Sequence, residues 1–402
     1  MKHAKLLRGE YVMDFYKKAM EYKQTLINIR RDFHREPELG FEEHKTSQKI
    51  KKYLENMGIE YESVARTGIK AVIKGRGSKT IALRADMDAL PIEEKAQHQY
   101  KSEIPGKMHA CGHDAHMAIL LGAAMILKSM EKELKGNVVL LFEPAEETVG
   151  GARFMVEEGV LENPHVDAVI GLHVDESLQC GTIGLKSGAA YAASNPFSVK
   201  IRGKGSHGAH PEMGIDPITI SCNVINALQT MISRETSPTE PAVLTIGAIH
   251  GGTAENIIPD EVEFKGTMRT MSSKHRQFLK SRFMEIVEGV SASMRGSAEI
   301  NMIDGYPSVH NDDIMLEFSR ETALELIDSD KIIDLKNPSM GVESFAYFSM
   351  ERPSVYYFLG CGNKEKGIIH PAHNSMFDVD EDCLTLGAAL QALLAYKYLN
   401  DK

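Results

Sequence analysis

The sequence has few cysteines, and no two of them lie close together. The 402 residues include five, an odd number, and no CxxC pair occurs among Cys111, Cys180, Cys222, Cys361 and Cys383. A disulfide scaffold uses paired cysteines in a short secreted chain. The cysteine pattern therefore argues against such a scaffold, and Cys111 is left free to act as a thiolate ligand.

The chain also lacks a long apolar run and an obvious targeting segment. Its longest strongly apolar stretch, residues 117–127, is well short of the ~20 residues that a membrane span needs. The first 18 residues contain no apolar core followed by a small-residue cleavage site. We therefore expect a cytoplasmic protein that does not enter a membrane.

A surplus of positive charge is absent as well. The sequence has 46 basic and 56 acidic residues, which give a formal net charge of -10, and it has no long basic run. Nucleic acids and anionic membranes are therefore disfavoured as partners. The composition favours chemistry on a small molecule or a peptide.

The order of expected helices and strands indicates an α/β domain. Residues 14–40 predict a helix that ends at Pro37, and residues 41–60 predict another that ends at Gly58. Strand-like runs such as TIALRADMD, NVVLLFEPAEE and AVIGLHV then alternate with helical segments. Such alternation is typical of an α/β domain whose sheet is largely buried.

A second domain is expected to interrupt the first. Around residues 184–217 the sequence becomes rich in Gly, Ser, Ala and Pro, which marks a boundary. The following segment reads strand, helix, strand, strand, helix, strand, an order typical of a small α+β, ferredoxin-like sandwich. Helix and strand patterns of the first kind return after it. Because the chain exceeds what one core usually organises, we assign residues 1–187 and 304–402 to one domain and residues 188–303 to an inserted domain.

Candidate ligands follow three expected strands of the first domain. Asp86 and Asp88 come after one strand, Glu146 and Glu147 come after the next, and His173 ends a third. Open α/β sheets place their ligand sites at the carboxyl ends of strands. We therefore expect these side chains to lie at one edge of the sheet.

The segment HACGHDAH, residues 109–116, is the densest cluster of possible metal ligands in the chain. Thiolate and imidazole are usual zinc ligands, and Gly112 permits the sharp bend that lets Cys111 and His113 approach one ion. The alternative is a buried free cysteine beside a hydrogen-bonded histidine. The density of donors favours a metal site.

The adjacent carboxylates Glu146 and Glu147 suit two different tasks. One can bind a metal while its neighbour takes a proton from water, a pairing that hydrolysis needs. The alternative is that both acids lie in solvent at the start of a helix. Their position beside other possible metal ligands favours the role in hydrolysis. His370 and His373 supply further imidazoles. This many donors favours two ions about 3.5 to 4 Å apart and leaves their number and identity open.

A set of motifs occurs in one order along the chain. They are LINIRRDFHREPELGFEEHKTSQKI, IALRADMDALPIEE, MHACGHDAHMAILLGAA, LFEPAEETVGGARFMVEEG, GLHV, GKGSHGAHPEMGIDPI, GGTAENIIPDEVEFKGTMRT and HPAHNSMFDVDED. In this order they resemble the metallo-amidohydrolases that include hippurate hydrolases, bacterial N-acyl-amino-acid deacylases and plant indoleacetyl-amino-acid hydrolases, which are related to zinc metallopeptidases. The resemblance implies a catalytic α/β domain with a zinc-peptidase-like sheet and an inserted α+β lid domain.

The resemblance also places the reaction centre. It implies a divalent metal cofactor, with two ions of zinc, manganese, cobalt or nickel per subunit. Glu146 takes the position of the general base. Of the two C-terminal histidines, His373 fits the pattern and His370 does not, because an aromatic residue, Phe377, follows His373 by four positions. The metal ligands fall on Cys111, His113, Glu147, His173 and His373.

On the inserted domain, the resemblance places His207 near the scissile carbonyl, and Asn256 and Arg269 near the substrate carboxylate. From the residues alone, Arg269 also suits a surface ion pair and Asn256 also suits a turn. A homodimer or homotetramer formed through the inserted domain fits the resemblance, and nothing in the sequence requires it.

Further residues are expected to support the ligands. Asp86 and Asp88 suit hydrogen bonds to the free nitrogens of metal-bound imidazoles, and His109 and His116 are assigned to the same supporting role. Ser344 departs from the family's usual acidic residue at its position. This departure is expected to affect substrate preference or metal affinity.

These residues imply hydrolysis of the amide bond of an N-acyl amino acid with an acetyl, benzoyl or similar acyl group. The metal would supply an acidified water, Glu146 would take its proton and pass it to the leaving amine, and His207 would help to stabilise the oxyanion.

Alternatives within the enzyme class are a dipeptidase or carboxypeptidase and an N-acetyl-diaminopimelate deacetylase. Outside it, a metal-binding or sensor protein is disfavoured, because storage needs no spare base. A redox role for Cys111 lacks a nearby partner cysteine.

Overall fold

The computed structural model describes residues 15–400, which form two compact units. The expectation about the first 18 residues falls mostly on residues 1–14, outside the described part. Among the described residues, the first unit comprises 15–190, 310–337 and 344–400, and the second comprises Tyr191–Val309 and Pro338–Glu343.

A mixed sheet forms the centre of the first unit. Its strands are β1 Glu60–Val64, β2 Gly68–Ile73, β3 Thr80–Asp86, β4 Asn137–Glu143, β5 Ala168–Gln179, β6 Ile183–Leu185, β15 Ile332–Asp334 and β16 Ser354–Gly362. Their order across the sheet is β1-β2-β4-β3-β5-β16-β6-β15. β3 runs parallel to both β4 and β5, and β16 runs parallel to β5. The carboxyl ends of these parallel strands therefore meet at one edge.

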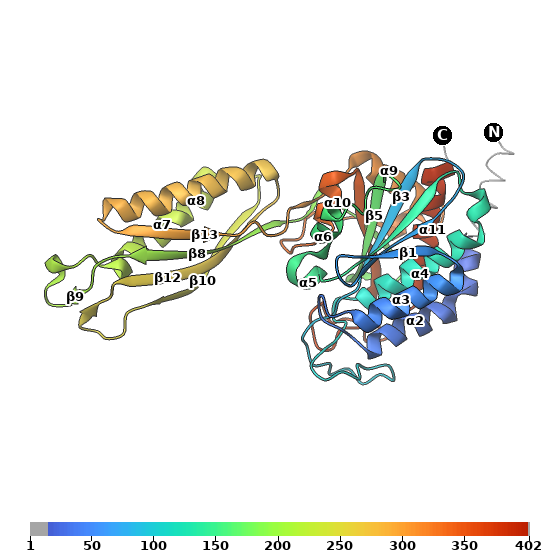
Figure 1. The fold of residues 1–402 in the computed structure, drawn as a ribbon, viewed down its shortest axis with the longest axis horizontal. Helices are drawn as coiled ribbons and strands as arrows, with labels where there is room; N and C mark the ends of the chain where they lie inside the picture. The colour runs from blue at the N-terminus through green and yellow to red at the C-terminus, as the bar shows by residue number, and fades with distance from the viewer. Residues whose placement is uncertain (1–14, 401–402) are drawn as a thin grey trace. The chain divides into compact units, whose positions relative to one another are not determined.

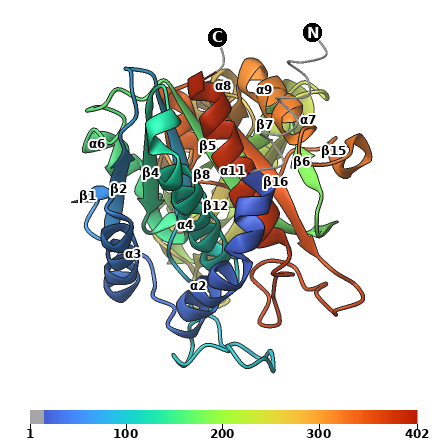
Figure 2. The ribbon, with the colours of Figure 1, turned by 90° about the vertical axis from the view of Figure 1, so that its right-hand side faces the viewer.

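Helices cover both faces of this sheet. In chain order they are α2 Lys23–Arg35, α3 His44–Met57, α4 His113–Ser129, α5 Glu146–Val149, α6 Gly151–Glu157, α9 Asp313–Ala323, α10 Ala346–Glu351 and α11 Cys383–Asn400. Figure 2 shows α2, α4 and α11 side by side on one face. Figure 1 shows α6 and α10 on the opposite face. The layers are thus helix, sheet and helix, and the sheet is buried on both sides.

The apolar helices α4 and α11 pack against each other in the core. Nearly all of α4 is buried, because its sequence is apolar on every side. Small residues permit the close approach of its neighbours: a Cβ on Gly122 would lie 2.6 Å from Leu26 Cδ2 and 3.0 Å from Ala388 Cβ. Within residues 15–400, no helix has both the length and the apolarity needed to cross a membrane.

The second unit packs an antiparallel sheet against two helices. Its main elements are β8 Ala193–Arg202, α7 Pro217–Glu235, β10 Ala242–Gly251, β12 Glu261–Thr270, α8 Ser273–Ser293 and β13 Ser297–Met302, with the short strands β9 Ser206–His207 and β11 Ile257–Ile258. The sheet order is β10-β12-β8-β13. Asp216 caps α7 by accepting a hydrogen bond from Ile218 N, and Ser272 caps α8 by accepting one from His275 N. Such caps explain why the helices begin at these residues.

The predicted fold class is confirmed, since a mixed α/β unit carries an inserted α+β unit. The chain bends at Gly112, which has φ 83°, and turns there directly into α4 at His113. One local prediction is wrong. His173 does not end its strand, because β5 continues to Gln179. Pairing of β5 with β3 stops at Gly171, while pairing with β16 holds the strand extended beyond that point.

Gly122→Val should lower the stability of the first unit, because the added methyl groups have no space beside α2 and α11. Overpacking of this kind costs about 1–3 kcal/mol. Gly289→Val in α8 is the matched control, since nothing lies within 4 Å of a Cβ there, and it should leave unfolding unchanged. Thermal unfolding followed by circular dichroism compares the two. Equal shifts would contradict the tight packing at Gly122.

Candidate metal centre

The candidate residues extend from two neighbouring strand ends of the first unit. β3 ends at Asp86 and pairs in parallel with β4, which ends at Glu143. Asp88 follows the first strand, and Glu146 and Glu147 begin the short helix after the second. The parallel register therefore brings segments that are distant in sequence to one edge of the sheet.

The structure brings the predicted metal ligands together. The donor atoms of Cys111, His113 and His173 lie within 4.8 Å of one another, and so do those of Cys111, Glu147 and His373. Within these groups, Cys111 Sγ lies 3.4 Å from His173 Nε2, and Glu147 Oε1 lies 3.1 Å from His373 Nε2. Because both groups include Cys111, the arrangement suits two neighbouring ions that share a ligand.

Only one of the two C-terminal histidines reaches these donors. His373 has φ 66° and its backbone N–H donates to Ala110 O at 2.7 Å, which ties its loop to HACGHDAH. His370 belongs to none of the donor groups found in residues 15–400. The aromatic residue that singled out His373, Phe377, is buried and packs close to Gly112.

Backbone carbonyls orient two of the imidazoles. His113 Nδ1 lies 2.8 Å from the Asp88 carbonyl oxygen, and His173 Nδ1 lies 2.6 Å from the Val174 carbonyl oxygen. Because a carbonyl only accepts, each Nδ1 is the donor and each Nε2 is left for an ion. His113 Nε2 is buried without a hydrogen-bond partner among the described residues. A buried nitrogen of this kind fits a metal ligand.

A bound cation would change the ionisation of these residues. Burial raises the pKa of the Cys111 thiol well above its ordinary value. Burial also opposes ionisation of Glu147, but His373 and His113 outweigh it and lower the pKa of Glu147. A divalent ion displaces the proton of a coordinating thiol and neutralises a carboxylate. The set of thiol, carboxylate and imidazole therefore fits a divalent metal.

Asp88 connects the ligands with the adjacent carboxylates. Its side chain accepts hydrogen bonds from the backbone N–H groups of Glu146 and Glu147, at 3.0 Å each. Its carbonyl accepts the bond from His113 described above. Asp88 thus fixes the start of α4 relative to the start of α5.

Asp86 and His116 form a buried pair behind the donors. His116 Nδ1 lies 2.6 Å from Asp86 Oδ1, and His116 Nε2 accepts a hydrogen bond from Val174 N at 3.0 Å. Both ring nitrogens are therefore used, and burial lowers the pKa of His116 to about 4. His116 is a neutral positioning group rather than a free ligand. His109 is buried too, and neither of its nitrogens has a hydrogen-bond partner within residues 15–400.

Ser344 contacts the predicted general base directly. Its backbone N–H donates to Glu146 Oε1 at 3.0 Å, and its hydroxyl donates to the buried carboxylate of Glu143. Arg84 reaches both side chains, with Nη2 3.2 Å from Ser344 Oγ and Nε 2.7 Å from Glu143 Oε2. An ionised acid at position 344 has no hydrogen to donate to Glu143. Ser344, which stands where the family usually has an acidic residue, therefore suits the neighbouring carboxylate of Glu143.

Sequence reasoning missed Glu43. Its Oε1 accepts a hydrogen bond from Ala145 N at 2.7 Å, and its Oε2 accepts one from the Thr67 hydroxyl at 2.6 Å. Ala145 precedes Glu146 and has φ 53°, which is uncommon for a residue other than glycine. Glu43 thus helps to hold the turn that presents the two carboxylates. Its one signal was its place in the FEEH segment.

In the second unit, His207 and Asn256 lie together and Arg269 lies elsewhere. His207 in β9 pairs with Ile257 in β11, and the backbone carbonyl oxygen of Asn256 accepts a hydrogen bond from Gly208 N at 2.8 Å. Arg269 is near the far end of β12, about 26 Å along an extended strand from its first residue. One ligand the size of an acyl amino acid does not span both places within one copy of this unit.

Arg269 is not engaged in the surface ion pair that was the alternative for it. Among the described residues it has no ion-pair partner, and its Nη1 is buried without a hydrogen bond. Burial lowers the pKa of its guanidinium. A half-buried guanidinium without a partner suits a carboxylate ligand.

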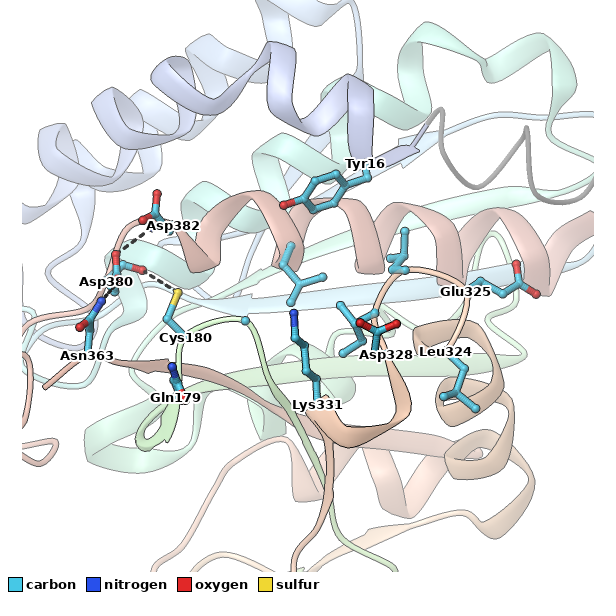
Figure 3. A pocket seen from close by; sticks show the side chains of 14 residues that line it. Tyr16, Gln179, Cys180, Leu324, Glu325, Asp328, Lys331, Asn363, Asp380 and Asp382 are labelled. Atoms are coloured by element: carbon cyan, nitrogen blue, oxygen red, sulfur yellow. Dashed lines mark hydrogen bonds between the residues drawn. The ribbon is translucent and has the colours of Figure 1, made fainter. Parts of the chain in front are cut away.

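A cavity of about 630 Å³ in the first unit is a separate feature (Figure 3). None of the predicted metal ligands lines it, and Cys180, Asp380 and Asp382 are among its lining residues. Lys366 lies 2.7 Å from Asp380 and 2.8 Å from Asp382, and Lys23 lies 2.6 Å from Asp382. Asp380 and Asp382 are therefore each paired with a lysine, and the cavity lies apart from the candidate metal centre.

Similarity to known hydrolases over most of the chain makes the protein an enzyme of the amidohydrolase and peptidase class. The family is more specific. Residues 82–397 match the family described as peptidase family M20/M25/M40, and the chain belongs to it.

Similar proteins extend over most of the chain. IAA-amino acid hydrolase ILR1-like 4 of Arabidopsis thaliana is 40% identical, over 95% of this chain and 87% of its own. N-acetyl-L-cysteine deacetylase of Bacillus subtilis is 42% identical, over 90% and 85%. Thermostable carboxypeptidase 2 of Saccharolobus solfataricus is 40% identical, over 94% and 97%. The relatives share the family and differ in the substrates that their names give.

A solved structure is similar in both units. A Bacillus subtilis protein described as a dinuclear metal-binding peptidase of the M20 family is 36% identical and has a TM-score of 0.83, over 95% of this chain and 100% of its own. Two ions are thus described for a related protein whose fold matches this one. The overlapping donor groups found here are compatible with that description.

Gly112→Ala should disturb the candidate centre, because residue 112 has φ 83° and a Cβ there would lie 2.3 Å from Val174 Cγ2. We expect a loss of about 1–3 kcal/mol of stability and zinc binding that is weaker by roughly tenfold or more. Gly159→Ala is the matched control, since it has φ 78° with nothing within 4 Å of its Cβ. Calorimetric titration of zinc into the apoproteins measures both affinities. If the two variants bind zinc equally well, the bend at Gly112 does not position the ligands.

Proposed function

We propose that the protein is a metal-dependent amidohydrolase that cleaves N-acyl amino acids. The observation that carries the proposal is the position of Glu146, a buried carboxylate within 4.8 Å of donor atoms of His113 and Glu147. The other donors suffice for the metal, so Glu146 is available as a base. The names of the plant hydrolase and the Bacillus deacetylase support N-acyl amino acids as the substrate class.

In this proposal the metal centre holds two divalent ions of zinc, manganese, cobalt or nickel. A divalent ion supplies a Lewis acid that lowers the pKa of water and polarises the amide carbonyl. The two overlapping donor groups and the related dinuclear structure support this assignment. The residues that would hold the ions are Cys111, His113, Glu147, His173 and His373.

Glu146 acts as the general base and then as the general acid. It takes the proton of the attacking water and returns it to the amine that leaves. The hydrogen bond from Ser344 N to Oε1 fixes the plane of its carboxylate, and Asp88 fixes its backbone. A base that serves one water at one position needs both restraints, because proton transfer requires a short and directed hydrogen bond.

Substrate recognition is assigned to the second unit. The unpaired guanidinium of Arg269 would bind the substrate carboxylate, Asn256 would contact its neighbourhood, and His207 would stabilise the oxyanion. Because His207 and Arg269 are far apart within one copy, one substrate needs them from two copies. The proposal therefore includes a homodimer, or a homotetramer built from it, through the second unit.

A carboxypeptidase or dipeptidase is the second candidate. Similarity to a thermostable carboxypeptidase favours it. A peptide and an N-acyl amino acid both carry a carboxylate beside the scissile amide, so the residues at the centre serve either substrate. The group on the acyl side of the bond distinguishes the two activities.

Glu146→Gln should lower kcat by roughly 100-fold or more, because an amide of nearly the same shape cannot take the proton. The variant should keep its metal. Glu157→Gln is the matched control: it removes an exposed carboxylate that pairs with Arg153 and should retain the wild-type rate. Amine release and metal content are measured on the same samples. A Glu146→Gln enzyme near the wild-type rate would exclude Glu146 as the base.

Metal-reconstituted protein should release the amine from N-acetyl, N-benzoyl or indoleacetyl amino acids, lose this activity on chelation and regain it when the ion is restored. Zinc, manganese, cobalt and nickel are compared in parallel. Faster cleavage of plain dipeptides would support the second candidate instead. Turnover that persists in the metal-free protein would contradict both.

A further inference from the structure

A second set of metal-type donors lies in the first unit, outside the candidate metal centre. It consists of His34 in the last turn of α2, and of Glu94 and His98 in the long connection between β3 and α4. One donor atom from each of the three lies within 4.8 Å of the others. We propose that these residues form a further binding site for a divalent ion of the zinc class.

The spacing of the donor atoms suits one small ion. Glu94 Oε1 lies 3.3 Å from His34 Nε2 and 2.9 Å from His98 Nε2. In a tetrahedral site with metal–ligand bonds of about 2.0–2.1 Å, neighbouring ligand atoms are about 3.3 Å apart. Two imidazoles with one carboxylate form a known zinc ligand set, which leaves a fourth position for water.

The imidazole of His98 is held beside Glu94. Its Nε2 lies 2.9 Å from Glu94 Oε1, close enough for a hydrogen bond between an imidazole and a carboxylate. The ring also stacks on Tyr100, with centroids 3.8 Å apart and planes at 15°. An ion bound by both residues would replace the proton between Nε2 and Oε1.

The remaining atoms of the cluster are held as a metal site requires. Glu94 Oε2 accepts a hydrogen bond from Ser102 N at 2.7 Å, so Oε1 is directed to the histidines. His34 Nδ1 lies 2.8 Å from Asp114 Oδ2, and a carboxylate on the distal nitrogen of a ligand histidine fixes its orientation. The same oxygen of Asp114 lies 2.9 Å from Arg30 Nε. The cluster thus has an outer layer of partners that is separate from its three donors.

Without an ion, the same contacts form a charged hydrogen-bond network. Burial lowers the pKa of His34, but Asp114 and Glu94 outweigh it and raise the pKa to about 9. A proton on His34 Nε2 then takes the position of the ion. The two states exclude each other, and uptake of metal distinguishes them.

An ion at this site would restrain the connection that leads into α4. Residues 87–112 contain no helix or strand apart from isolated bridges. Ordered connections of this length are uncommon without a specific function or restraint. The site would tie the connection to α2, and it shares no donor with the candidate metal centre.

Zinc content tests the proposal. Full-length apoprotein is reloaded with zinc, freed of excess metal and analysed for zinc per chain. We expect His98→Gln to hold one equivalent fewer than the wild type. His165→Gln is the matched control, because His165 lies 2.9 Å from Glu162 on the surface and belongs to no donor group in the described chain; it should equal the wild type. Equal zinc content in His98→Gln and the wild type would overturn the proposal.

Cobalt substitution identifies which ion is lost. A cobalt ion bound to Cys111 gives a thiolate charge-transfer band, whereas one bound by His34, Glu94 and His98 gives d–d bands alone. We expect His98→Gln to lose d–d intensity and keep the thiolate band unchanged. Loss of both would show that the substitution acts through the candidate metal centre, and it would overturn the proposal. Neither readout depends on turnover, so failure of the proposed amidohydrolase activity is seen separately.

Discussion

The candidate metal centre depends on the hydrogen bonds of one buried residue, Asp88. Its carbonyl holds His113 in the tautomer that leaves Nε2 for a metal, and its carboxylate accepts from the backbone of Glu146 and Glu147. Ligand and base therefore keep one spacing although they belong to different helices. Without the carboxylate, two buried N–H groups would each lose a partner, at a cost of about 1–3 kcal/mol per group. The hydrogen bonds to Asp88 therefore stabilise the turn that carries Glu146 and Glu147.

Behind Asp88 lies a chain of buried charges. Arg84 is fully buried, and it pairs with Asp86 at 2.6 Å and with Glu143 at 2.7 Å. Buried charges are costly unless every one is paired and hydrogen-bonded, and here Ser344 and His116 complete the bonds of the two carboxylates. The network reaches His113 on one side and the predicted base on the other. Small movements of either are therefore opposed by the whole network.

The candidate metal centre and the residues proposed to contact the substrate belong to different units. All donor groups found in residues 15–400 lie in the first unit, where the sheet and the apolar helices hold them. The relatives share the family, and their names describe an IAA-amino acid hydrolase, an N-acetyl-L-cysteine deacetylase and a carboxypeptidase. A metal centre that contacted only the scissile amide bond would serve several amide substrates. Substrate specificity would then depend on the surfaces around that bond.

Local sequence patterns predict the order of helices and strands, the ends of helices such as α3 and the kinds of donor available, because these follow from neighbours along the chain. The apolar run of α4, the αL glycine that ends α3 at Gly58 and the density of HACGHDAH are all local signals. Tertiary structure alone decided which histidine nitrogens are free, that His116 is saturated, that Ser344 touches Glu146 and that His34 meets Glu94. Those contacts join segments far apart in the chain. The packing of the helices on the buried sheet sets the distances between these side chains, and no local sequence pattern encodes those distances.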